Sequence, residues 1–264
     1  MGGKSWAVRR VTVVLALVLV VAACSGDDDS ADSDAAAPTT TEDDADVTIE
    51  PSTTTEPVAE GCADPASVRE EPSNEGDVVD LDGDRRPDTV WVASPGGGRR
   101  VLGVTTAAGG GDAVDIASAS PVALNVLVAD ADETPPVELF VSDNRGVQLW
   151  AFADCRLQPV TDPDGQPYLF DLGLRGYGTG LGCVDADGDG RRDLVGLNAV
   201  GDDGRGAVEW TRTIVERDGL VASNGATDEG TYQSPADDAD IELLRSVTCG
   251  DLTLDADGIP QPEE

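Results

Sequence analysis

The chain has 264 residues, of which 39% are hydrophobic and 4% aromatic, so part of it cannot belong to a packed core. Its net charge of −35 would repel nucleic acid, which excludes that class of partner and favours divalent cations instead. There is no histidine, and Lys4 is the single lysine. These absences exclude a Ser-His-Asp or Cys-His triad, a histidine-ligated zinc ion, a Schiff-base lysine and a P-loop.

Residues 1–23 have the pattern of an export signal. Three basic residues precede an apolar run over residues 11–23, which is too short to cross a bilayer comfortably as a helix. The run ends in Val-Ala-Ala-Cys24, which resembles a bacterial lipobox, and this implies that Cys24 carries a lipid and becomes the first mature residue. An ordinary signal peptide with an incidental cysteine is the alternative. The predicted location is the outer face of the bacterial cell membrane, with the lipid as anchor.

Residues 24–60 are predicted to be the lipidated Cys24 followed by a disordered linker. The segment from 25 to 60 is rich in Asp, Thr, Ser, Ala, Pro and Glu, and it contains twelve acidic residues and no basic residue. Such a composition cannot bury enough apolar surface to offset the entropy of ordering the chain. Residues 61–264 therefore remain as the predicted folded domain.

Four cysteines remain in that domain, which permits three pairings. We favour Cys62–Cys155 and Cys183–Cys249, because Cys183 and Cys249 each lie two residues before an aspartate at the end of an apolar segment. Equivalent positions on neighbouring repeats could lie close together. A four-thiolate zinc site is the alternative, although the sequence has no CxxC pair.

The domain contains an internal repeat built around an acidic segment. Residues 80–90 recur as residues 185–195 with every aspartate matched, and residues 130–138 are a weaker copy. We name these segments the first loop (80–88), the middle loop (130–138) and the third loop (185–193). Their starts lie 50 and 55 residues apart, the size of a propeller blade. Each loop has a predicted strand on either side, followed by a glycine-bearing hairpin and another strand.

The spacing of the carboxylates within each loop has a chemical reason. Carboxylates at positions 1, 3, 5 and 9, with a backbone carbonyl at position 7 and glycine at position 4, form an oxygen shell that suits calcium. An acidic, solvated loop without a ligand is the alternative. The predicted calcium ligands are the carboxylates of Asp80, Asp82, Asp84, Asp88, Asp185, Asp187, Asp189 and Asp193 and the backbone carbonyls of Arg86 and Arg191.

The middle loop departs from this pattern. Asp130, Asp132 and Glu138 keep acids at positions 1, 3 and 9, but Glu133 replaces the glycine of position 4. Two prolines at positions 6 and 7 alter its backbone as well. The sequence therefore leaves open whether this loop binds a metal ion strongly.

The first and third loops resemble the calcium loops of FG-GAP or VCBS repeats, the blades of integrin-alpha-type β-propellers. The pattern of that family is Asp-x-Asp-Gly-Asp-Gly-x-x-Asp followed by a strand. The third loop matches it fully, and the first departs only in Arg85, which replaces the second glycine. The resemblance covers about residues 76 to 215.

The resemblance implies an all-β fold, namely a small or incomplete β-propeller of about three to four blades. Residues 241–248 are predicted to begin a fourth unit, and residues 255–258 to belong to a tail. An open stack of sheets is the alternative arrangement.

Such a scaffold suits a binding or adhesion module whose partner is an extracellular protein or glycan. A structural envelope role is the alternative, and a carboxylate- or calcium-dependent carbohydrate-active enzyme is a further one; we do not expect an enzyme. Trp91, Trp150 and Trp210 recur at strand positions and are predicted to lie in the core rather than on a sugar-binding surface.

Overall fold

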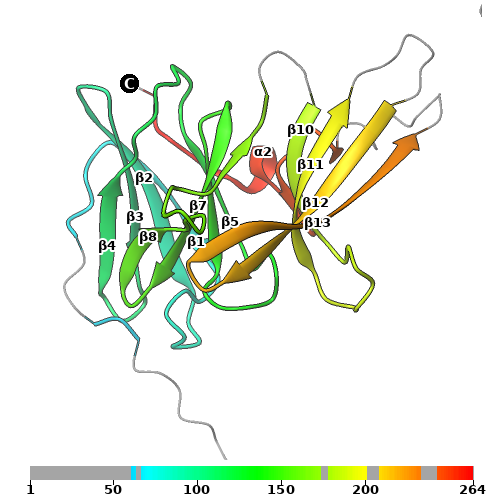
Figure 1. The fold of residues 1–264 in the computed structure, drawn as a ribbon. Helices are drawn as coiled ribbons and strands as arrows, with labels where there is room; N and C mark the ends of the chain where they lie inside the picture. Colours follow the sequence, from blue (N-terminus) through cyan, green and yellow to red (C-terminus); the bar gives the residue numbers. More distant parts are fainter. Residues whose placement is uncertain (1–60, 64–66, 174–177, 201–207, 233–242, 264) are drawn as a thin grey trace, which may run out of the picture. The chain divides into compact units, whose positions relative to one another are not determined.

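The computed structural model describes five stretches of the chain (Figure 1), which are residues 61–63, 67–173, 178–200, 208–232 and 243–263. The predicted signal peptide, the lipidated Cys24 and the linker all fall within residues 1–60 and lie outside the described residues. The described part is mostly β and consists of four antiparallel sheets. Its one named helix, α2 (Leu254–Asp257), is a single turn. The predicted all-β class is therefore confirmed for these residues.

The first sheet is a four-stranded meander in the order β1-β2-β3-β4. Its strands are β1 (Ser73–Val78), β2 (Asp88–Gly96), β3 (Arg99–Thr105) and β4 (Gly111–Asp115). Trp91 of β2 is fully buried, as predicted, and stands opposite Gly103 of β3. Trp150 and Trp210, for which the same was predicted, are only partly buried. A Cβ atom at position 103 would lie 2.1 Å from the indole ring, so only glycine leaves room for this tryptophan.

The middle sheet repeats this plan with two additions. Its meander is formed by β5 (Asn125–Ala129), β6 (Glu138–Ser142), β7 (Gly146–Ala153) and β8 (Arg156–Pro159). The short strand β9 (Leu169–Asp171) pairs with β7, and β16 (Ile259–Pro260) adds to the free edge of β5.

The third sheet is again a meander, formed by β10 (Gly178–Val184), β11 (Asp193–Val200), β12 (Val208–Asp218) and β13 (Val221–Tyr232). The fourth sheet has only two short strands, β14 (Thr248–Cys249) and β15 (Leu252–Thr253). In each of the three meanders an acidic loop joins the first strand to the second. The last residue of that loop, Asp88, Glu138 or Asp193, is the first residue of the second strand.

The middle sheet has buried apolar residues on both faces. Leu139 and Val141 of β6 pack in one cluster with Val90 and Leu102 of the first sheet. Phe140, between them, belongs to another cluster that includes residues of the third sheet. Because alternate side chains of a strand point to opposite faces, one strand serves both cores. The three meanders are thus joined by two hydrophobic cores.

The C-terminal part differs from both expectations made for it. Residues 243–246 form a helical residue, a turn and a bend where a strand was expected. The chain then makes a single parallel bridge between Val247 and Leu181, and only Thr248 of the predicted segment lies in a strand, β14. Ile241 and Glu242 lie outside the described residues. Residues 255–258 are no tail either. Thr253 caps the turn of α2, and Ile259 then pairs with Val126 and is buried against it in the core, which fixes this end of the chain.

Both favoured disulfides are present. Cys62 pairs with Cys155 across a Cα–Cα distance of 5.6 Å, and Cys183 pairs with Cys249 across 4.6 Å. Two disulfides indicate an oxidising compartment outside the cytoplasm. None of the helices in the described ranges is long and apolar enough to span a bilayer.

Candidate metal centre

Three groups of carboxylates occupy equivalent places in the three meanders. Each consists of the residues at positions 1, 3 and 9 of an acidic loop, and within a group one carboxylate oxygen from each residue lies within 4.8 Å of the other two. Like charges at this separation repel one another unless a cation or hydrogen-bond donors neutralise them. The groups are Asp80, Asp82 and Asp88; Asp130, Asp132 and Glu138; and Asp185, Asp187 and Asp193.

The first loop is folded around its position-1 carboxylate. Asp80 accepts a hydrogen bond of 2.7 Å from the backbone N–H of Gly83 and one of 2.6 Å from that of Arg85. Arg85 has a φ of 66°, so this non-glycine residue adopts the left-handed conformation that points its N–H at Asp80. The position-9 carboxylate, on Asp88, accepts a hydrogen bond of 2.7 Å from Leu81 and thereby closes the loop.

The third loop has the same hydrogen-bond framework. Asp185 accepts bonds of 2.7 Å from Gly188 and 3.1 Å from Gly190, and Asp193 accepts one of 2.8 Å from Ala186. Both glycines have positive φ, 84° and 90°, at the positions where the first loop has Gly83 and Arg85. Two loops far apart in the chain therefore fold the same way because their aspartates bind the same backbone N–H groups.

The position-5 residues lie outside these groups. Asp84 pairs with its neighbour Arg86, with 2.5 Å between Nη2 and Oδ2, and this hydrogen bond lowers the pKa of the Asp84 carboxyl. It also accepts the backbone N–H of Arg86 at 2.8 Å, and Asp189 accepts that of Arg191 at the same distance. In the structure these two predicted ligands stabilise the turn at position 7, whose backbone carbonyls are themselves predicted ligands.

The first and third loops differ in how deeply they lie in the protein. Asp88 is only 1% exposed, and burial raises the pKa of its carboxyl, while hydrogen bonds from Leu81 and Ala107 oppose that shift. Asp185 and Asp187 are exposed. The donor set in both loops consists of carboxylate oxygens, which suits a hard divalent cation such as calcium. The residues present therefore fit the predicted ion in either loop.

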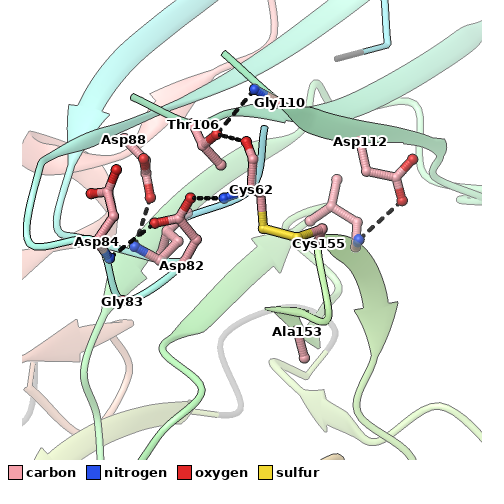
Figure 2. Close-up of a disulfide and its surroundings, with 12 residues drawn as sticks. Cys62, Asp82, Gly83, Asp84, Asp88, Thr106, Gly110, Asp112, Ala153 and Cys155 are labelled. Atoms are coloured by element: carbon pink, nitrogen blue, oxygen red, sulfur yellow. Dashed lines mark hydrogen bonds between the residues drawn. A yellow bond between two sulfur atoms is a disulfide. The ribbon is translucent and has the colours of Figure 1, made fainter. Parts of the chain in front are cut away.

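The first loop also contacts the Cys62–Cys155 disulfide (Figure 2). The backbone N–H of Cys62 donates a hydrogen bond of 2.7 Å to Oδ2 of Asp82. The carbonyl of Cys62 in turn accepts bonds from Thr106 Oγ1 at 2.7 Å and from the N–H of Gly110 at 2.9 Å. Nothing in the spacing of the cysteines pointed to this contact, because it is made by the backbone.

In the middle loop the carboxylates are in contact with an arginine. Arg217, from β12 of the third sheet, approaches Asp132 at 2.8 Å and Glu138 at 2.6 Å through Nη2. Its side chain is 1% exposed. Burial raises the pKa of the Glu138 carboxyl to about 7, and the charge of Arg217 opposes this shift. Sequence reasoning missed Arg217, because it lies 85 residues from Asp132 and has no motif of its own.

Comparison with protein-family models, curated proteins and solved structures finds no significant match to this chain.

Proposed function

We propose that this chain is an exported calcium-binding β-repeat protein that serves as a binding module at the cell surface. The observation that carries this proposal is the set of backbone hydrogen bonds that the first and third loops share, each of which gathers three carboxylates within 4.8 Å. The two disulfides support a place outside the cytoplasm. The lipid predicted on Cys24 would then provide attachment to the membrane.

The sheets support the finer proposal of propeller-like blades. Each meander has four antiparallel strands with its acidic loop between the first and second strand, as the resemblance to FG-GAP and VCBS repeats implies. We propose that the meanders are three such blades of a small or incomplete propeller. The two-stranded sheet β14-β15 accompanies them.

Calcium would act in these loops as a brace. A bound ion would neutralise three carboxylates that otherwise repel one another and would fix the connection between the first two strands of the blade. At a concentration 100 times the dissociation constant, each site would stabilise the fold by about 2.7 kcal/mol. The predicted linker, as a random coil, would span about 35 Å and would hold this scaffold away from the membrane, within reach of an extracellular protein or glycan.

The metal assignment is tested by calorimetric titration of the full chain with calcium after treatment with EGTA. The Asp185→Asn variant should bind one ion fewer than the wild type. Asp251 lies in the exposed turn between β14 and β15, outside the loops, so Asp251→Asn is the matched control and should bind as the wild type does. If the wild type binds no calcium, or if Asp185→Asn binds as many ions, the assignment is wrong.

The binding role is tested by crosslinking on intact cells that carry the chain. A partner should be captured in millimolar calcium and lost in EGTA, and the double variant Asp80→Asn/Asp185→Asn should lose it in both. Asp251→Asn should retain it. If the captured partner is the same with and without calcium, and in the wild type and the double variant, a purely structural role in the envelope is favoured.

A further inference from the structure

The middle loop differs from the other two in what its carboxylates contact. Nε and Nη2 of Arg217 bond to the two carboxylate oxygens of Asp132, each at 2.8 Å. Nη2 also lies 2.6 Å from Oε1 of Glu138 and 2.5 Å from the carbonyl oxygen of Thr134. One guanidinium therefore bonds to the carboxylate of position 3 and to the backbone at position 5, and it lies in charge contact with the carboxylate of position 9, whose Oε1 accepts no hydrogen bond.

The backbone of the middle loop explains why a side chain is needed there. In the first and third loops the residue at position 6 donates its N–H to the position-1 carboxylate. Position 6 of the middle loop is Pro135, which has no N–H to donate. Oδ1 of Asp130, at position 1, is buried without a hydrogen-bond partner. The loop thus keeps its acids but loses part of the donor set that neutralises them elsewhere.

Charge and burial together favour the arginine over a metal ion. A divalent cation bound by Asp132 and Glu138 would stand within a few ångströms of the guanidinium, and the two like charges would repel one another strongly in a buried site. The side chain of Arg217 is 1% exposed, and its backbone is paired with Ala222 of β13, so the guanidinium is enclosed by the loop that it contacts. The arginine and a metal ion therefore exclude each other.

We propose that the middle loop is a built-in guanidinium site, in which the side chain of Arg217 takes the place of the metal ion expected in the first and third loops. The chain would bind two calcium ions instead of three. The contacts of Arg217 would hold the third sheet against the middle loop whether or not calcium is present. The count of two ions rests on the proposed function, whereas the guanidinium contacts do not depend on it.

The first test substitutes the same loop position in two loops. Asp132 and Asp187 both stand at position 3, so Asp132→Asn and Asp187→Asn form a matched pair. In calcium titrations of the full chain we expect two ions for the wild type, two for Asp132→Asn and one for Asp187→Asn. Three ions in the wild type, or the loss of an ion in Asp132→Asn, would overturn the proposal.

The second test uses the melting temperature in EGTA. Asp132→Asn should lower it by about 5 °C or more, because breaking one partner of a buried ion pair is strongly destabilising. Asp187→Asn should leave it nearly unchanged in EGTA and lower it only in calcium. A melting temperature of Asp132→Asn that falls only in calcium would contradict the guanidinium site. If the wild type binds no calcium but Asp132→Asn still melts lower in EGTA, the calcium function fails and the guanidinium site stands.

A double-mutant cycle separates the ion pair from a general loss of packing. Arg217→Met should be nonadditive with Asp132→Asn in EGTA, since the two residues share one interaction, and additive with Asp187→Asn. Additivity in both pairs would count against the proposal. Should Arg217→Met fail to fold, the two preceding measurements decide the question without it.

Discussion

The backbone N–H of Cys62 donates a hydrogen bond of 2.7 Å to Oδ2 of Asp82, and this bond links the Cys62–Cys155 disulfide to the first loop. Asp82 is the position-3 member of that loop's carboxylate group. Hydrogen bonds to charged groups contribute more than those between neutral groups, about 1.5–3 kcal/mol. The disulfide therefore helps to orient one of the three acids of the first loop and none of those of the third.

Loss of this disulfide should weaken calcium binding at the first loop alone. In Cys155→Ser, which leaves the backbone of Cys62 unsubstituted but untethered, we expect an affinity at the first loop lower by about tenfold, which corresponds to about 1.4 kcal/mol. The affinity of the third loop, read from the same calorimetric titration, serves as the internal control. An equal loss at both loops, or none at either, would contradict the link.

Replacing Arg85 by glycine should strengthen the first loop. Arg85 has a φ of 66°, and an L-residue other than glycine in the left-handed region costs about 1 kcal/mol. Arg85→Gly should therefore raise the stability in calcium and narrow any difference in affinity between the first and third loops. Arg85→Ala removes the charged side chain but keeps the strained conformation, so it should not raise the stability or the affinity. If both variants raise them, the cause is the loss of the arginine charge and not the relief of strain. Thermal melting and calcium titration of both variants give the answer.

A methyl group at position 103 should lower the free energy of unfolding. The Cβ of Gly103→Ala would stand 2.1 Å from the ring of the fully buried Trp91, and overpacking of a core costs about 1–3 kcal/mol. Gly182, in β10, is the matched control, because the nearest atom to a Cβ there is 3.5 Å away. We expect a clear loss in the free energy of unfolding for Gly103→Ala and little change for Gly182→Ala, measured by chemical denaturation. Comparable losses in the two variants would argue against the clash.

The cross-strand pair Arg212–Asp228 gives a prediction for pH. Arg212 Nη2 lies 2.7 Å from Oδ2 of Asp228, and this hydrogen bond lowers the pKa of the Asp228 carboxyl. A carboxyl with a lowered folded-state pKa contributes stability that is present above its unfolded pKa and is lost as the pH falls through the folded value. NMR titration should find the pKa of Asp228 below its ordinary value in the wild type and closer to it in Arg212→Gln. Arg156→Gln, in the middle sheet, should leave the pKa of Asp228 as it is; an unchanged value in Arg212→Gln would remove the pair as its cause.

The repeat could be read from the sequence because its signal is local. The aspartates of residues 80–90 and 185–195 recur at fixed offsets, and the strands on either side follow from alternating apolar residues and glycine turns. The left-handed conformation at Arg85 was likewise implied, by the glycine that stands at the same position of the third loop. The fold class and the place of each loop between two strands were predictable for this reason.

What escaped prediction depends on contacts between distant parts of the chain. Arg217 reaches Asp132 across 85 residues, and the backbone of Cys62 reaches Asp82 without any side-chain signature. The C-terminal segment was misjudged for a related reason: Ile259 is one apolar residue among polar ones, and only its pairing with Val126 on the edge of β5 turns the segment into a strand. The sequence shows no periodic pattern for such a pairing, because a two-residue strand is too short to have one.

The position of Cys155, in the turn between β7 and β8, determines how the domain would carry mechanical load. Cys62 is among the first described residues, so tension applied to the chain before it can reach the middle sheet directly through the S–S bond as well as along the backbone toward β1. The S–S bond would therefore share the load with the ladder between β1 and β2. If the domain is held at one end by a membrane tether and at the other by a partner seated on the middle or third sheet, the S–S bond would limit how far Cys62 can be displaced, and with it the backbone N–H that holds Asp82 of the first loop.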